Sequence, residues 1–162
     1  MVWLRGEAAK KRIVSIQKRA IRTVSKSYTN SHTEPRMKKL DILKLEDLYS
    51  HQCTALIHDS IHHRAPKAIK NLLSIGTETT SINLRSHQSD PFHIRIPTTK
   101  TKIGTNSFFC KGPRLWNNLS KETQEIKSRS SFKTKSKKLL LDQYNTKANC
   151  SNPNCSDRRH HS

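Results

Sequence analysis

Acidic residues, glycines and aromatic residues are all scarce in this chain. Its 162 residues include 12 acids against 31 lysines and arginines, which gives a formal net charge of +19. Aromatic residues make up 6% of the chain, and four residues are glycine. A chain this basic repels itself in the compact state unless a polyanion offsets the charge. The shortage of acids therefore favours nucleic acid as the partner, with an anionic membrane surface as the alternative.

Long apolar runs are absent as well. No segment approaches the ~20 apolar residues that a membrane-spanning helix needs, and the first residues, MVWLRGEAAKKR, lack the apolar run of a signal peptide. Without a secretory signal, the four cysteines are expected to stay reduced. We therefore expect an intracellular protein, nuclear or cytoplasmic, that binds no membrane. The sequence gives no oligomeric state.

Apolar periodicity predicts a mainly α-helical fold. Leu, Ile, Val and Phe make up about 21% of the chain, so a core requires that they gather in a few segments. Steps of three and four residues predict helices over about 7–26, 45–62 and 131–144, with shorter helical turns between them. The stretches FHIRIPTTK and NSFFCK have strand character, and they predict a short β-hairpin near residues 92–110.

The chain is expected to divide into four segments. Residues 1–73 are expected to form a basic amphipathic helical segment, and residues 74–91, rich in Ser, Thr and Asn, a mobile loop. Residues 92–144 contain the hairpin and the C-terminal helices. The polar residues 145–162 are expected to be a disordered tail.

A few large or rigid residues are expected to hold this small fold together. Trp116 follows a Gly-Pro turn and should be an apolar anchor that closes a thin core, with Leu119 on the same side. Stacking of Trp116 on a base is the alternative. Phe132 lies on the apolar side of the last helix. Pro35 fits the first turn of a short helix with Thr33 as its N-cap.

The first helix has the clearest functional pattern. One stripe of apolar residues is expected to pack inward: Ala9, Ile13, Ile16, Ala20 and Val24. The opposite face contains cations and no carboxylate, which predicts contacts with phosphate groups, a solvated face being the alternative. The expected nucleic-acid contacts are Lys11, Lys18, Arg19, Arg22 and Lys26, with Lys133, Lys137 and Lys138 as a second patch.

Three separated blocks occur in a recognisable order: QKRAIR at 17–22, HTEP at 32–35 and LDILKLEDLY at 40–49. HHRAPKAIKNLL and GPRLWNNL follow them. Together they resemble the region downstream of the polymerase core in LINE-type (non-LTR) retrotransposon reverse transcriptases, over about residues 2–144. Ser120 departs from the proline usual in that family. The resemblance implies a C-terminal piece of such a protein, decayed or domesticated, that helps to hold template RNA and target DNA.

Residues for catalysis are missing. A polymerase needs paired carboxylates that hold two metal ions, and the chain has no Asp-Asp pair. Glu46 and Asp47 are the only neighbouring acids, and they are expected to be helix-start charges. The family's endonuclease has no counterpart either. We expect a non-catalytic chain without a cofactor, whereas the full-length family protein would be an RNA-directed DNA polymerase. The alternative is a protein-binding helical adaptor, or a domesticated remnant without a nucleic-acid role.

Two motifs resemble zinc sites in part. HDSIH, at 58–62, has the spacing of a His-Glu-x-x-His site, but Asp59 is one methylene too short to activate water and no third ligand is evident. His51, His58, His62 and His63 are expected to form a partly exposed polar edge. In the tail, Cys150, Cys155 and His160 are weak zinc candidates, because the gap between the cysteines is longer than the usual two residues.

Overall fold

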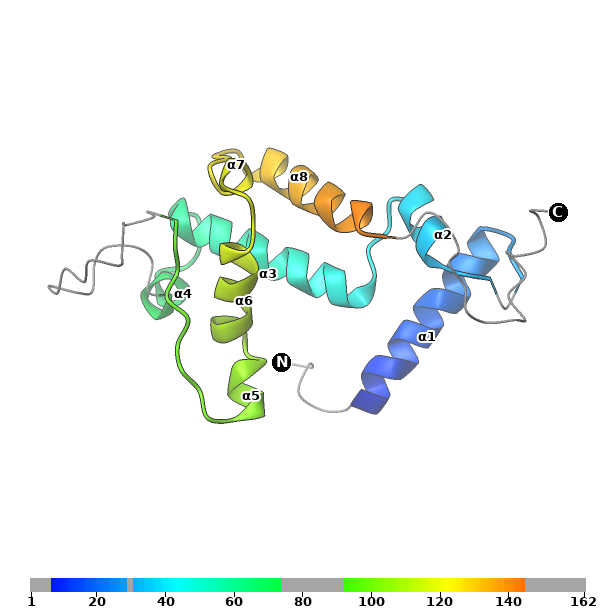
Figure 1. The fold of residues 1–162 in the computed structure, drawn as a ribbon, viewed down its shortest axis with the longest axis horizontal. Coiled ribbons are helices and arrows are strands. Elements are labelled where there is room, and N and C mark those ends of the chain that lie inside the picture. The colour runs from blue at the N-terminus through cyan, green and yellow to red at the C-terminus, as the bar shows by residue number, and fades with distance from the viewer. Residues whose placement is uncertain (1–6, 29–30, 74–91, 145–162) are drawn as a thin grey trace, which may run out of the picture. The chain divides into compact units, whose positions relative to one another are not determined.

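The structure is a computed structural model, and it describes residues 7–28, 31–73 and 92–144 (Figure 1). Over these ranges the fold is mainly α-helical, which confirms the expected fold class. The expected loop at 74–91 and the expected disordered tail at 145–162 lie outside the described residues. The helices are α1 (Glu7–Val24), α2 (Glu34–Lys39), α3 (Leu45–Ile61), α4 (Lys67–Leu72), α5 (Lys102–Thr105), α6 (Phe108–Asn117), α7 (Lys121–Gln124) and α8 (Arg129–Asp142).

The chain forms two compact units. Unit 1 comprises Met1–Leu48 and Lys137–Ser162, and unit 2 comprises Tyr49–Ser136. The boundaries fall inside α3 and α8, so each of these helices contributes residues to both units. The units therefore differ from the segments 1–73 and 92–144 that the sequence suggests.

Unit 1 has a small core in which side-chain hydrogen bonds supplement apolar packing. The buried core residues are Ile21, Met37, Leu43, Leu141 and Tyr144. On α1, the Gln17 side chain donates from Nε2 to the Leu43 carbonyl at 2.8 Å and accepts at Oε1 from the Leu45 amide at 3.2 Å. Gln17 thereby satisfies backbone groups where the chain enters α3 and fixes α1 beside that turn.

The rotation of α1 differs from the expected one. The apolar stripe does not pack inward: Ile13, Ile16 and Val24 are 46%, 66% and 68% exposed, and the two alanines of the stripe are exposed too. Ile21 is buried, and Val14 and Gln17 beside it are half-buried. Val14, Gln17 and Ile21 form a line that lies about a quarter of a turn around the helix from the apolar stripe, at 100° per residue. The bonds of Gln17 to Leu43 and Leu45 account for the difference, because they turn the side of α1 that carries Gln17 toward the rest of unit 1.

Unit 2 is built around the tryptophan. Its buried core residues are Ala55, Ile57, Leu73, Ile94, Trp116 and Phe132. Trp116 is fully buried, and its Nε1 donates to the Phe92 carbonyl at 2.8 Å. Gly112 allows α6 to approach α3, since a Cβ at this position would lie 3.0 Å from Cδ1 of Ile57. The aromatic anchor is thus held by both packing and a hydrogen bond.

The hairpin expected near residues 92–110 is not formed, and this prediction is wrong. Residues 102–105 and 108–117 are helical, with Gly112 and Pro113 inside α6. Asn117 pairs with both backbone groups of Ile94, accepting from its N–H at 3.1 Å and donating to its carbonyl at 2.9 Å. The Asn117 side chain thus forms the pair of hydrogen bonds that a strand partner would form with Ile94. Thr101 accepts from the Gly104 amide and caps α5.

Candidate nucleic-acid interface

The candidate interface begins with the cations of α1. Lys11, Lys18 and Arg19 are exposed, and so is Lys26 just beyond the helix end. After Glu7 the helix contains no carboxylate. Among the residues that the structure describes, none of these four cations forms an ion pair with a carboxylate. Their charge is therefore open to a ligand of opposite sign.

Arg22 differs from the other cations because it is half-buried and oriented. Its Nε donates to the Ser31 carbonyl at 3.2 Å. Ser31 is itself buried and bonds from Oγ to the Tyr28 carbonyl at 2.6 Å. Within the described ranges, the terminal guanidinium nitrogens have no partner. A guanidinium fixed at one edge and open at the other is suited to bidentate contact with a phosphate.

Lys18 and Arg22 border a groove of unit 1. Its volume is about 410 Å³. One wall is α1 and the other comprises residues 31–37 and 44–46. The residues that line it are Val14, Gln17, Lys18, Arg22, Ser31, His32, Thr33, Glu34, Met37, Lys44, Leu45 and Glu46. The sequence did not predict this groove, although Lys18 and Arg22 were among the expected phosphate contacts.

The second expected patch, on α8, is less open than the first. Lys137 forms an ion pair with Asp41. Lys133 is half-buried, and its carbonyl bonds to Nε2 of His51 at 3.0 Å. Lys138 is exposed. Lys133 also belongs to unit 2, whereas the other two lysines belong to unit 1. α1 is therefore the stronger candidate surface.

Comparisons with known proteins give no match. No protein-family model, no curated protein and no solved structure matches the chain. The resemblance to LINE-type reverse transcriptases thus stays a prediction.

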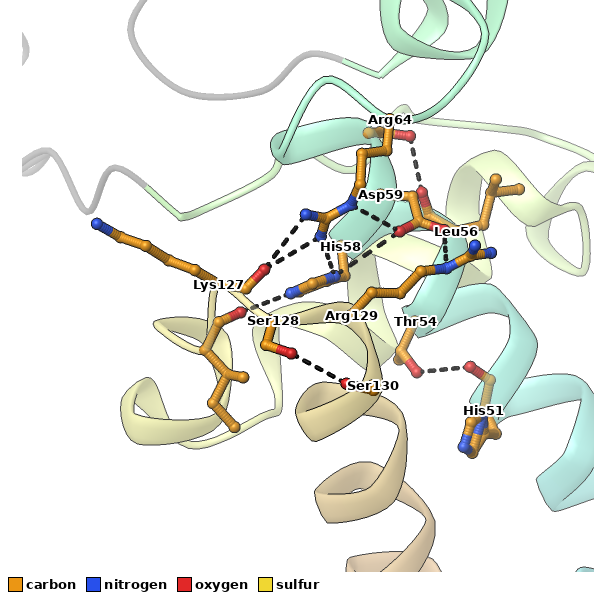
Figure 2. A network of polar contacts seen from close by, with 12 residues as sticks. His51, Thr54, Leu56, His58, Asp59, Arg64, Lys127, Ser128, Arg129 and Ser130 are labelled. Atoms are coloured by element: carbon orange, nitrogen blue, oxygen red, sulfur yellow. Dashed lines mark hydrogen bonds and ion pairs between the residues drawn. The ribbon is translucent and has the colours of Figure 1, made fainter.

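The expected partly exposed edge holds for half-buried His62 and exposed His63 and is wrong for His51 and His58, which are buried. His58 and Asp59 belong to a buried structural network (Figure 2). His58 is fully buried. Its ring lies 4.3 Å from that of Phe132 and stacks on it. Its Nε2 bonds to the Ile126 carbonyl at 2.6 Å, and its Nδ1 lies 3.1 Å from a terminal nitrogen of Arg64. Because Arg64 can only donate there, Nδ1 accepts and Nε2 carries the proton. Burial lowers the pKa of His58, and the charges of His62 and Arg64 lower it further.

Asp59 completes this network as an anion between two arginines. Its side chain is buried, with Oδ1 3.3 Å from Nε of Arg64 and Oδ2 3.0 Å from Nε of Arg129. A carboxylate held in this way cannot serve as a zinc-site base. Across the described ranges no group of three metal-ligating side chains occurs. The weak candidates Cys150, Cys155 and His160 lie outside those ranges.

The residues expected to support the fold lie in or beside it. Trp116 and Phe132 are fully buried with ring centroids 5.7 Å apart, so Trp116 is not accessible for base stacking. Leu119 packs against the same core. Pro35 lies in the first turn of α2, but the Thr33 side chain makes no capping hydrogen bond, contrary to expectation.

Glu46 and Asp47 lie in the first turn of α3, as expected for helix-start charges. Within the described part of the chain, no helix is long and apolar enough to cross a membrane.

Proposed function

We propose that this protein binds the phosphate groups of nucleic acid and is not itself a catalyst. The observation that carries the proposal is the surface of α1. Lys11, Lys18 and Arg19 are exposed on a helix without an opposing carboxylate, and Arg22 is oriented beside them by its bond to Ser31. Contacts of this kind position a nucleic acid without reading its bases.

The sequence blocks give this proposal a context. QKRAIR lies on α1, and HTEP lies at the start of α2. In the LINE-type family that these blocks resemble, the corresponding region follows the polymerase core. We therefore propose that the chain corresponds to that region and holds template RNA or target DNA, in the nucleus or the cytoplasm. Consistent with a supporting role, the purified chain should not extend a primer on an RNA template with Mg²⁺.

The test is the salt dependence of binding. Labelled RNA and DNA are titrated by fluorescence anisotropy at several salt concentrations, for the parent chain and for a variant with Lys11, Lys18 and Arg19 changed to Gln. Each lost phosphate contact reduces the slope of log affinity against log salt by about 0.7–0.9. The variant should therefore have a slope smaller by about 2–3, with similar losses for unrelated sequences.

A matched control removes the same charge elsewhere. Lys67, Lys100 and Lys102 are exposed in unit 2, and changing them to Gln should leave most of the slope intact. Equal losses in the two variants would mean that net charge alone attracts the nucleic acid. Absence of binding by the parent chain at low salt would refute the proposal.

A protein-binding role is the second candidate, and the exposed apolar stripe of α1 favours it. Ile13, Ile16 and Val24 lie on one side of the helix and are largely exposed. Amphipathic helices commonly bind partner proteins through such stripes. An apolar contact of this kind would weaken little with added salt, in contrast to phosphate binding.

A further inference from the structure

We propose that the groove of unit 1 takes one unstacked base of a single-stranded nucleic acid, while the adjoining phosphate binds to Lys18 and Arg22. This inference rests on the proposed nucleic-acid function and names the form of the ligand. A phosphate-binding surface alone would accept double and single strands alike. The groove adds a feature that only an unpaired base can use.

The size and lining of the groove suit a base. Its volume of about 410 Å³ falls in the usual range of small-molecule sites, roughly 300–1,000 Å³. Val14 and Leu45, which are both half-buried, supply apolar surface for the face of a ring, and polar groups lie around them. Met37 and Ser31 are buried, so this part of the lining is set by the fold.

The cations fix where the phosphate would lie. Lys18 and Arg22 are one helical turn apart on the same wall, within reach of one phosphate group. The Nε bond of Arg22 to Ser31 already holds the guanidinium, so less side-chain freedom is lost when it binds. A nucleotide has this arrangement, with an anion at one end and a flat ring at the other.

The two carboxylates of the groove are both ion-paired. Glu34 pairs with Lys44 at 2.6 Å, and Glu46 pairs with Lys10 at 2.7 Å. Their charges are offset by these lysines, so a neutral base can lie near them. The phosphate binds instead to Lys18 and Arg22, which have no carboxylate partner among the described residues. The base therefore lies toward the paired carboxylates. In a duplex the base is stacked and paired and cannot enter, so the groove selects single strands.

The first test compares ligands on the unaltered chain. Fluorescence anisotropy at one salt concentration measures binding of a labelled single-stranded oligonucleotide, of an abasic strand with the same phosphates, and of a duplex. A base in the groove removes apolar area from water against its aliphatic walls, which an abasic strand cannot do. We expect the abasic strand to bind about tenfold more weakly than the strand with bases. Equal binding of both strands would overturn the inference and leave the proposed function standing.

The second test fills the groove. Val14→Phe adds a ring inside it, and Val24→Phe makes the same change at an exposed position of α1. The first variant should bind both strands equally weakly with an unchanged salt slope, and the second should behave like the parent. A folded Val14→Phe chain that still prefers the strand with bases would overturn the inference. If the parent chain binds none of the ligands, the proposed function is refuted instead.

A third measurement needs no variant and covers the case in which Val14→Phe fails to fold. A strand with photoreactive 5-iodouracil bases is cross-linked to the parent chain, and the modified peptide is identified by mass spectrometry. Cross-links are expected in the groove walls, at residues 14–22 or 31–37. Cross-links confined to other parts of the chain would overturn the inference.

Discussion

The hydroxyl of Tyr144 donates a hydrogen bond to Oδ2 of Asp47 at 2.6 Å, although 97 residues separate them in sequence. The same oxygen accepts from the Lys44 amide at 2.7 Å, and the Lys44 ammonium lies 4.5 Å from the centre of the ring. Burial and the bond to Asp47 raise the pKa of Tyr144. One phenol thus joins the residues after α8 to the start of α3 inside unit 1.

Tyr144→Phe removes this junction while keeping the ring. The free energy of unfolding should fall by about 1–2 kcal/mol, because the Lys44 amide and the Asp47 carboxylate both lose a partner. Chemical denaturation measures the change. Tyr28→Phe is the matched control, since Tyr28 is 75% exposed and should change stability by less than about 0.5 kcal/mol. Equal effects in the two variants would contradict the structural role of Tyr144.

Asn117→Ala should destabilise unit 2 by about 1–3 kcal/mol, because the buried residue Ile94 loses the partners of its N–H and carbonyl. Asn118→Ala alters the exposed neighbour at the end of α6 and should cost less. Thermal unfolding of the two variants, followed by circular dichroism, makes the comparison. If Asn118→Ala is the more harmful change, Asn117 does not replace the strand partner.

Trp116→Ala should cost about 3–5 kcal/mol, the usual range for emptying a large aromatic site. Trp116→Phe keeps part of the ring volume but loses the bond from Nε1 to Phe92, so its cost should be smaller. Denaturant titrations of both variants test the order. A Trp116→Ala chain as stable as the parent would show that the core of unit 2 closes without this residue.

Acid should weaken unit 2. Burial lowers the pKa of both His58 and His62 below the ordinary value of 6.5. The unfolded chain then binds more protons than the folded chain as the pH falls below about 6.5, so stability is lost in that direction. The midpoint of thermal unfolding should be lower at pH 5.5 than at pH 7.5.

A pair of histidine variants tests the cause of this pH dependence. His58→Gln should reduce the difference between the two pH values, since the buried titrating group is gone. His93→Gln, at an exposed position, should leave it as in the parent. A parent chain that is equally stable at both pH values would contradict the burial of these rings.

The sequence predicted which segments are helical better than it predicted how they face. Apolar periodicity identified α1, but its rotation depends on Gln17, a polar residue whose partners Leu43 and Leu45 lie far along the chain. Likewise, the residues around Ile94 have strand character, yet the backbone of Ile94 bonds to the Asn117 side chain. His58 is buried because Phe132 covers it. Local patterns do not contain such long-range partners.

The candidate site could be predicted from the sequence only in part, because part of it also depends on long-range partners. The run of cations on α1 is visible in the sequence, because charge and helical spacing are local properties. The groove was not, since it also needs residues 31–37 and 44–46. The orientation of Arg22 depends on the Ser31 carbonyl, a backbone group that no residue pattern identifies.

Because the unit boundaries fall inside α3 and α8, unit 1 depends on both ends of the chain, whereas unit 2 depends only on its middle. Tyr49–Ser136 is one uninterrupted stretch, whereas unit 1 is assembled from stretches on both sides of it. A stop codon in place of Lys137 would remove Leu141 and Tyr144 from the core of unit 1 and leave every residue of unit 2 in place. Damage to the C-terminal end of the reading frame would thus act first on α1 and its groove, at the other end of the sequence.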